Sequence, residues 1–330
     1  MSAGRRCLIL GGTGHIGNAF LRALLQGGHE ASTACRRDGE RPNLHGLKIK
    51  LLVGDDRKTD QLARWVRGHD LVIDAAAPYP LRLVDPRATH HQQVETALQR
   101  CRRLIDAVED ADAELIHVSS FTTLRRERPW HGRLQSFAVQ GSHPYFETKA
   151  TIERAVLQAA AGGLRAVVVN PSVCLGPYDL KPKQAAFVAA VARGELWGVT
   201  TQPLNVIDVR DVADLALEAL SKKIYGRPIA LSGHNTDLAS LVHDICRLAG
   251  RQPPLMQGST RLAAAGAWWT ELAASTFGRA ESCPSLPFLL LCECHAAAPS
   301  RLQQGLGLSP RPLGATLGDA LRWYQSIGYC

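Results

Sequence analysis

At 330 residues, the chain is long enough for one large α/β domain or two smaller ones with a substantial buried core. Apolar residues make up 45% and charged residues 21%, which is ordinary for a soluble globular protein. The formal net charge is +8, but the arginines are scattered rather than gathered into a tract. This charge weakly favours an anionic cofactor or substrate and argues against nucleic acid as a partner.

The cysteines and the lengths of the apolar stretches indicate where in the cell the protein is expected. The nine cysteines have no framework spacing, and Cys292 and Cys294 lack a second close pair that would complete a zinc site. The first strand is expected to begin almost at the N-terminus, without room for a signal peptide, and no stretch reaches the roughly 20 apolar residues of a membrane span. We therefore expect a cytoplasmic chain with reduced cysteines, no metal and no stable membrane insertion.

A glycine-rich turn follows the first predicted strand. The strand covers Cys7–Leu10, and apolar residues from Ile16 onward recur at helical spacing. Gly11 permits a tight turn, Gly14 leaves room for a pyrophosphate, and Gly17 lets the helix lie close to the sheet. The helix N-terminus offers unpaired N–H groups to phosphates. The turn predicts a dinucleotide site formed by Gly11, Thr13, Gly14, His15, Ile16 and Gly17.

The end of the second predicted strand bears on the choice of cofactor. Residues 29–35 form this strand, and Arg36 and Arg37 follow it, with no carboxylate before Asp38. An acidic side chain here would bond the ribose 2′-hydroxyl of NAD, whereas arginine can pair with a 2′-phosphate. The two arginines predict NADP(H) rather than NAD(H), unless both are simply solvated at the strand end.

Strands and helices alternate through the first half of the chain. Further strands are expected over 47–53, 70–74, 115–120 and 164–170, with helices over 59–67, 88–111 and 145–161 between them. This alternation predicts an α/β fold with a doubly wound parallel (Rossmann) sheet, in which ligands bind beyond the carboxyl ends of the strands. Besides the glycine turn, those ends carry Asp55, Asp56, Ala75, Ala76, Ala77, Ser119 and Ser120.

The chain changes character after about residue 175. Residues 121–144 are expected as a long loop or lid, and later helices over 183–193, 211–220, 237–249 and 316–326. Short strands are expected near 205–208 and 228–231. We expect residues 1–175 to form the NAD(P)-binding domain, with some later segments returning to it, and residues 176–330 to form mainly a smaller substrate-binding lobe.

An alanine-rich stretch over residues 261–276 contains Trp268 and Trp269. We expect it to form a buried helix. The alternatives are a cover over a substrate cavity, a contact with a partner and a contact with a membrane surface.

Three residues are predicted to carry the chemistry. Tyr145 and Lys149 share one face of the expected helix, so the lysine ammonium can stabilise the tyrosine phenolate. Ser120, at the end of the fifth strand, can hold a substrate oxygen by a hydrogen bond. Because a nicotinamide carries the hydride, the protein need only move one proton and fix the geometry. Tyr145 is then the proton donor to a carbonyl or the acceptor from an alcohol.

Taken in order, these features resemble the extended short-chain dehydrogenase/reductase family. The matching positions are the glycine turn, Asp55, Ser120, Tyr145 and Lys149. The resemblance implies that Asp55 contacts the adenine and that Lys149 also bonds the nicotinamide ribose. It places three residues beside the nicotinamide, namely Pro171, Ser172 and Val173. It also implies a homodimer formed through helices that flank the sheet.

Within this family, residues 74–78 and 170–177 most resemble the dihydroflavonol-reductase-like branch. That branch includes members labelled hopanoid-associated sugar epimerases, and it mostly reduces ketones or aldehydes with NADPH. One position departs from the family pattern. Many extended members have an asparagine that supports a proton-relay water, and the chain has Ala97 there. The proton relay to the lysine is therefore expected to differ.

Three functions are compatible with these features. The first is an NADP-dependent oxidoreductase that reduces a ketone or aldehyde, or oxidises the alcohol, of a fairly large apolar small molecule. The alternative is a nucleotide-sugar epimerase or dehydratase with tightly bound NAD. It needs a diphosphate clamp in the second lobe, for which the chain offers Lys181, Arg193, Arg210 and Arg261. The third is a non-catalytic cofactor sensor, which would not need the serine, tyrosine and lysine. Asp211 is expected to be a helix cap or an ion-pair partner.

Overall fold

The computed structural model describes residues 4–36, 39, 41–56, 59–76, 89–124, 143–180, 186–276 and 286–330. The predictions made for Arg37, Ala77 and Lys181, and for most of the loop over 121–144, lie outside these residues.

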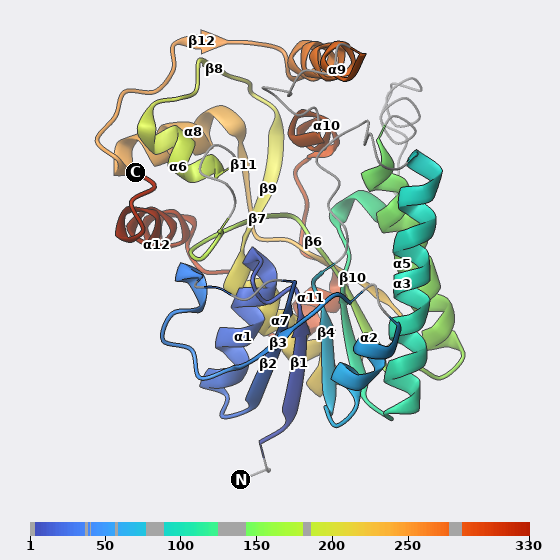
Figure 1. Cartoon of the computed structure of the whole chain (residues 1–330). Helices are drawn as coiled ribbons and strands as arrows, with labels where there is room; N and C mark the ends of the chain where they lie inside the picture. The colour runs from blue at the N-terminus through green and yellow to red at the C-terminus, as the bar shows by residue number, and fades with distance from the viewer. Residues whose placement is uncertain are drawn as a thin grey trace.

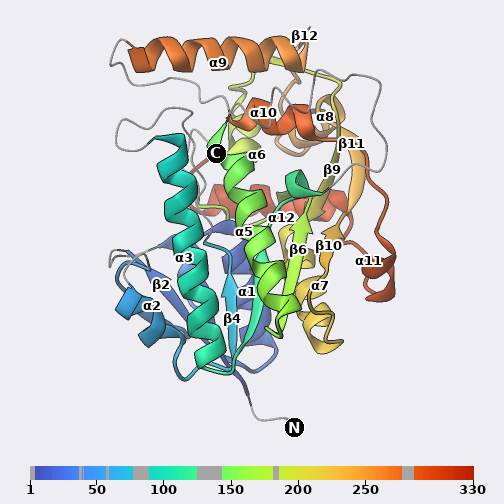
Figure 2. The same cartoon turned by 90° about the vertical axis from the view of Figure 1, so that its right-hand side faces the viewer.

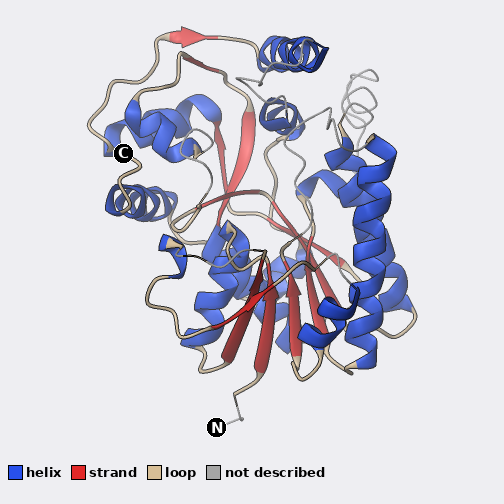
Figure 3. Ribbon diagram, in the orientation of Figure 1, coloured by secondary structure: helices blue, strands red, loops and turns tan. Residues whose placement is uncertain are grey.

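A seven-stranded parallel sheet forms the lower part of the molecule (Figures 1 and 3). Its order is β10-β6-β5-β4-β1-β2-β3, so the chain winds outward from β1 in both directions. The strands are β1 (Arg6–Leu10), β2 (Glu30–Cys35), β3 (Lys50–Val53), β4 (Leu71–Asp74), β5 (Glu114–Val118), β6 (Ala166–Pro171) and β10 (Pro228–Leu231). This order confirms the predicted doubly wound sheet.

Helices cover both faces of this sheet (Figure 1). One face carries α1 (His15–Gln26) and α7 (Val209–Ser221), and the other carries α2 (Thr59–Val66), α3 (His90–Asp110) and α5 (Pro144–Ala161). Each face of the sheet has its own apolar core. Alternate residues of each strand pack into the two cores because successive side chains point to opposite faces. In β1, Cys7 and Ile9 pack toward α1 and α7, whereas Leu8 and Leu10 pack toward α3 and α5.

A second group of elements lies beyond the carboxyl ends of the sheet (Figure 2). It contains a three-stranded sheet of order β11-β9-β7 and a two-stranded pair of β12 and β8. The strands are β7 (Val173–Leu175), β8 (Gly198–Val199), β9 (Pro203–Asp208), β11 (His234–Asp237) and β12 (Met256–Gln257). The helices are α6 (Phe187–Arg193), α8 (Leu238–Leu248), α9 (Thr260–Thr276), α10 (Leu286–Glu293) and α12 (Leu313–Ser326). Helix α11 (Arg301–Gly305) instead lies beside β10 of the large sheet. Short 3₁₀ turns, η1 (Pro42–Leu44) and η2 (Phe121–Thr123), complete the described chain.

Two expected strands differ from the structure. The third strand begins at Lys50 rather than at residue 47, because the Leu47 and Ile49 amides bond within a turn, to Leu44 and Leu47, instead of joining the ladder. The fifth strand ends at Val118, before the two serines, because the Ser120 side chain caps η2. Sequence reasoning also missed the short elements β7, β8, β11, β12, α10 and α11.

The alanine-rich stretch forms α9, but it is not a buried helix. Ala264 and Ala267 are buried on its inner side, whereas Leu262 is 75% exposed and Trp269 is 64% exposed. The inner side packs on α10, so only the side chains on that side are buried. The expectation of a buried helix was therefore wrong for the outer side of α9.

Candidate active site

The glycine turn has the geometry that a pyrophosphate cradle needs. Gly11 has φ +85°, and a side chain there would meet the Ala75 carbonyl oxygen at 2.6 Å. A Cβ on Gly17 would lie 2.2 Å from the Gly11 carbonyl oxygen, so only glycine lets α1 approach β1 this closely. A Cβ on Gly14 would meet only that same oxygen, at 3.2 Å, which leaves the remaining side of the turn open.

The N-terminus of α1 adds the charge that a phosphate requires. No side chain caps the helix at Gly14, and its first turn has no acidic residue. His15 lies on the first helical turn, with its Nδ1 at 4.0 Å from Asp179 Oδ2. Asn43 Nδ2 donates to the Thr13 carbonyl at 3.0 Å and fixes the turn from outside. These residues fit a dinucleotide pyrophosphate, since the backbone N–H groups and the helix dipole both favour an anion.

The residues predicted to hold the adenosine end lie beyond β2 and β3. Arg36 directly follows β2 and is exposed. The Asp55 backbone N–H donates to Gln61 Oε1 at 2.9 Å, and the Asp56 carboxylate accepts from Arg100 Nε at 2.6 Å. Asp56 is therefore tied to α3, a contact that the sequence did not predict. The cofactor roles of these residues stay predictions.

Tyr145, Ser120 and Lys149 come together at the carboxyl end of β5, as the sequence predicted. His143 caps α5 by accepting from the Tyr145 N–H at 3.2 Å, which fixes the first turn of the helix. The Tyr145 hydroxyl donates to Ser120 Oγ at 3.3 Å. Lys149 lies one helical turn after Tyr145 on α5, and its Nζ donates to the Val118 carbonyl at 3.2 Å. All three predicted residues are buried.

Burial changes the proton affinity of the lysine. It lowers the Lys149 pKa to about 8, because the ammonium ion loses water, and the negative charges of Asp74 and Glu153 offset only part of this effect. Lys149 can therefore change its charge within a physiological range of pH. This property suits a group that assists proton transfer at a neighbouring phenol.

Glu153 is a site residue that the sequence analysis missed. Its Oε2 accepts from Thr123 Oγ1 at 2.6 Å and from Asn170 Nδ2 at 2.6 Å, and it also accepts a short hydrogen bond from the Ser119 hydroxyl. Asn170 Nδ2 in turn donates to the Ser120 carbonyl at 3.1 Å. The signal was present in the sequence, since Tyr145, Lys149 and Glu153 follow at intervals of four on one helix face.

A buried ionic cluster supports the site from behind. Arg100 of α3 holds Asp74 at the end of β4 with two hydrogen bonds of 2.9 and 3.2 Å, and His117 Nδ1 lies 3.3 Å from the same carboxylate. Burial raises the pKa of Asp74, but the Arg100 guanidinium and His117 outweigh this effect and hold the pKa far below its usual range. Asp74 is therefore an anion that ties α3 to the centre of the sheet.

Ala97 is 1% exposed and packs among the apolar residues of α3 and α5. Its methyl group offers no hydrogen bond, so Ala97 cannot support a water in the way an asparagine would.

The nicotinamide residues expected from the resemblance lie at the end of β6. Pro171 closes the strand, and the Ser172 N–H donates to the Leu231 carbonyl at 2.9 Å. The Ser172 hydroxyl is buried and has no hydrogen-bond partner among the described residues. Val173 begins β7 and is half-buried. A buried hydroxyl of this kind fits a polar group of a ligand, although the role of Pro171–Val173 stays a prediction.

Apolar residues of α9 and α10 pack against Tyr145. Tyr145 and Phe146 pack in one cluster with Ala264 of α9 and with Leu286 and Leu289 of α10. The Tyr145 and Phe146 rings meet edge to face, with centroids 5.5 Å apart. The side of the site nearest α9 and α10 is therefore apolar.

The arginines considered for a diphosphate clamp lie on three different helices. Arg193 of α6 holds Glu195 at 2.5 Å, Arg210 of α7 holds Asp208 at 2.7 Å, and Arg261 is exposed on α9. Arg193 and Arg210 are thus committed to nearby carboxylates. Asp211 is an ion-pair partner of Arg311, as expected, while Asp208 caps α7.

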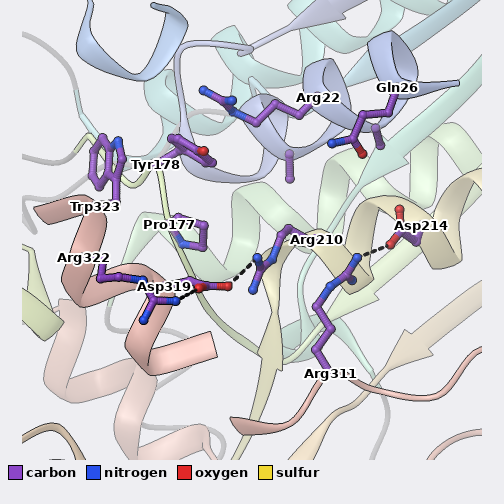
Figure 4. Close-up of a pocket in the computed structure, with 12 residues that line it drawn as sticks. Arg22, Gln26, Pro177, Tyr178, Arg210, Asp214, Arg311, Asp319, Arg322 and Trp323 are labelled. Carbon is purple, nitrogen blue, oxygen red and sulfur yellow. Dashed lines mark hydrogen bonds and ion pairs between the residues drawn. The ribbon is translucent and has the colours of Figure 1, made fainter. Parts of the chain in front are cut away.

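Arg210 lines a cavity of about 570 Å³ bordered by α1, α7 and α12 (Figure 4). Its charges are paired across the opening, with Arg210 bound to Asp319 at 2.7 Å and Arg311 bound to Asp214 at 2.9 Å. Because α1 and α7 cover the sheet face opposite α5, this cavity is distinct from the tyrosine site.

A doubly wound sheet, a glycine turn at its first helix and a buried tyrosine–lysine pair define a nicotinamide-dependent oxidoreductase of the Rossmann type. A sequence model of the NAD dependent epimerase/dehydratase family matches residues 7–229. The chain belongs to this family and is an NAD(P)-dependent enzyme of the extended short-chain dehydrogenase/reductase type.

Relatives match along nearly the whole chain. A putative dihydroflavonol 4-reductase of Synechocystis sp. is 26% identical, over 97% of this chain and 95% of the relative. Sterol demethylase protein B of Methylococcus capsulatus is 25% identical, over 97% of this chain and 98% of the relative. Among solved structures, a nucleoside-diphosphate-sugar epimerase from Pseudomonas aeruginosa has 25% identity and a TM-score of 0.75, with 99% of each chain covered.

Among the described residues, none of the helices has the length and hydrophobicity that a membrane span requires. The same residues contain no group of three or more side chains that could hold a metal ion.

Proposed function

We propose that the enzyme reduces a ketone or aldehyde on an apolar small molecule with NADPH, or oxidises the corresponding alcohol. The observation that carries this proposal is the position of Tyr145, which donates to Ser120 beneath the apolar residues of α9 and α10. The site thus combines a proton donor with an apolar surround. Residues 1–175 with β10 would hold the dinucleotide, and residues 176–330 would hold most of the substrate.

The proposed chemistry needs one proton transfer from the chain. When bound, NADPH would supply the hydride that the carbonyl carbon accepts. The Ser120 hydroxyl orients the carbonyl oxygen, and Tyr145 gives its phenolic proton to that oxygen as the C=O electrons move onto it. The Lys149 ammonium stabilises the remaining phenolate. The reverse sequence oxidises an alcohol.

Two observations favour the reductase over the nucleotide-sugar alternative. Arg193 and Arg210 are each paired with a nearby carboxylate, which weighs against a diphosphate clamp built from them. The relative named a putative dihydroflavonol 4-reductase matches almost end to end. The exposed Arg36 after β2 supports NADP(H), because no carboxylate stands at that position.

The first experiment is to determine the cofactor content of the freshly purified protein and to titrate empty protein with NADPH and NADH. Dissociable NADPH that binds more tightly than NADH supports the reductase, and a panel of apolar ketones and aldehydes then identifies substrates. NAD that stays bound through purification contradicts the proposal and favours the epimerase or dehydratase, which oxidises and re-reduces one substrate.

A further inference from the structure

The most exposed large apolar side chains gather at one end of the molecule. Among the described residues, the five highest exposures of this kind belong to Trp197 (89%), Leu255 (97%), Met256 (69%), Leu262 (75%) and Trp269 (64%). We call these five residues the apex patch. Isolated exposed apolar residues are common, but a group that includes two tryptophans marks an interaction surface.

The apex patch is built from two adjoining elements. In the parallel pair of β8 and β12, Gly198 lies opposite Met256, so Trp197 and Leu255 precede the paired residues on neighbouring strands. The chain then passes from β12 directly into α9, which carries Leu262 and Trp269. Figure 1 places β8, β12 and α9 together at the end of the molecule farthest from the N-terminus, and Figure 2 shows β12 and α9 at that same end.

Helix α9 has one face toward the active site and one face toward solvent. Its inner face packs Ala264 against the cluster that contains Tyr145. On the outer face, Leu262 and Trp269 are seven residues apart, which places them two turns apart on the same side. Exposure of these apolar side chains to water is energetically unfavourable, so we expect another surface to cover the outer face of α9.

Two exposed arginines lie along the chain segment that carries most of the patch. From residue 251 to residue 270 the chain carries two arginines, Arg251 and Arg261, and no carboxylate before Glu271. Both arginines are exposed. Near Trp197, the carboxylate of Glu195 is bound by Arg193 at 2.5 Å. The patch therefore combines tryptophan, leucine and methionine side chains with arginines, which is the composition of interfacial membrane anchors.

We infer that the apex patch docks on an anionic lipid bilayer, with Leu262 and Trp269 entering the headgroup–acyl boundary and Arg251 and Arg261 facing lipid phosphates. A second copy of the chain fits less well, because a two-fold contact through this patch would bring the same arginines toward each other. The arrangement is peripheral docking rather than insertion of a spanning helix. Docking also places α9, which packs over Tyr145, at the bilayer, where an apolar substrate partitions. This consequence rests on the proposed function.

The test is flotation of the full-length protein with vesicles, without substrate or cofactor, so that the result does not depend on the proposed reaction. One vesicle preparation is phosphatidylcholine alone, and the other contains phosphatidylglycerol in addition. The variants are Leu262→Gln with Trp269→Gln on α9, and separately Trp197→Gln with Leu255→Gln beside β8 and β12. Leu308→Gln, at a 45% exposed leucine outside the patch, is the control.

We expect the wild type and the control to float with the anionic vesicles, more weakly with the neutral ones and more weakly in high salt. Each patch variant should bind the anionic vesicles at least about tenfold more weakly, with an unchanged thermal unfolding temperature. The inference is wrong if the wild type floats with neither preparation, or if both patch variants float as well as the wild type. It is also wrong if the patch variants convert a sedimenting dimer into a monomer and flotation is absent, since a second copy then covers the patch.

Discussion

The Glu153 carboxylate lies 2.6 Å from the Asn170 side-chain nitrogen, where α5 meets the end of β6. Through this contact, one buried acid holds the segment that carries both site serines, because Ser119 and Thr123 donate to the same carboxylate oxygen. Asn170 also holds the Ser120 carbonyl at 3.1 Å. Glu153 is a positioning residue, since it acts on the serines and on the end of β6.

Replacing Glu153 by alanine should lower stability and activity together. The variant removes the acceptor shared by three buried donors, of which Asn170 and Thr123 can still donate to the Ser120 carbonyl. We therefore expect a loss of about 2 kcal/mol in the free energy of unfolding. Glu153→Gln keeps one oxygen acceptor and should recover part of the loss. Urea unfolding and steady-state kinetics measure both effects, and kcat should fall more than the KM for NADPH rises. Glu147→Gln, on an exposed position of the same helix, is the control and should change stability by less than about 1 kcal/mol.

Tyr145→Phe should remove reduction while leaving cofactor binding nearly intact. The phenyl ring keeps its contacts with Phe146 and α10, but the proton donor is lost. We expect kcat to fall by at least about 100-fold, the usual scale of general acid catalysis. Steady-state kinetics and NADPH titration measure the two properties separately. Substantial remaining activity would show that the proton comes from another group.

Lys149 should make stability depend on pH above neutrality in the cofactor-free protein. Its pKa of about 8 lies below the ordinary value of 10.5, so between these values the unfolded chain binds more protons than the folded chain. The free energy of unfolding should therefore rise with pH across this interval, by up to about 3 kcal/mol in total. Urea unfolding of the wild type and of Lys149→Met, at about pH 7.5 and about pH 9.5, measures the difference.

The variant should lack the lysine's share of this rise, while Lys48→Met, at an exposed position, should keep it. An equal pH dependence in the wild type and in Lys149→Met would mean that the buried ammonium is not destabilised.

Arg100→Leu should be among the most destabilising single changes in α3. It leaves the buried Asp74 carboxylate without the guanidinium that holds it at 2.9 Å, and breaking such a pair costs about 3–5 kcal/mol. Adding Asp74→Asn should restore part of this loss, because the uncompensated charge is removed. Urea unfolding of the two single variants and the double variant gives the coupling energy. Arg102→Leu, at an exposed position on the same helix, should change stability by about 0.5 kcal/mol or less.

Replacing Arg36 and Arg37 together by alanine should weaken NADPH binding far more than NADH binding. The expected reason is the loss of the cations that pair with the 2′-phosphate, which only NADPH carries. Titration of both cofactors, with Arg41→Ala as a nearby arginine control, measures the selectivity. Equal losses for the two cofactors would show that these arginines do not recognise the phosphate.

Local sequence determined the parts of the site that depend on neighbouring residues. The glycine turn was predictable because φ +85° at Gly11 and the close approach at Gly17 both require glycine. Tyr145 and Lys149 were predictable because a spacing of four places them on one helix face. The alternation of strands and helices predicted the doubly wound sheet, since parallel strands need helical connections that return the chain across the sheet.

The tertiary structure decided which distant residues meet. Asp74 pairs with Arg100, and Glu153 with Asn170, through packing of α3 and α5 against particular strands, and no local pattern fixes those partners. The same packing buries Ala264 over Tyr145 and leaves Trp269 outside. An alanine-rich helix has no strong apolar face of its own, so the neighbours it meets, rather than its sequence, determine which side leaves water.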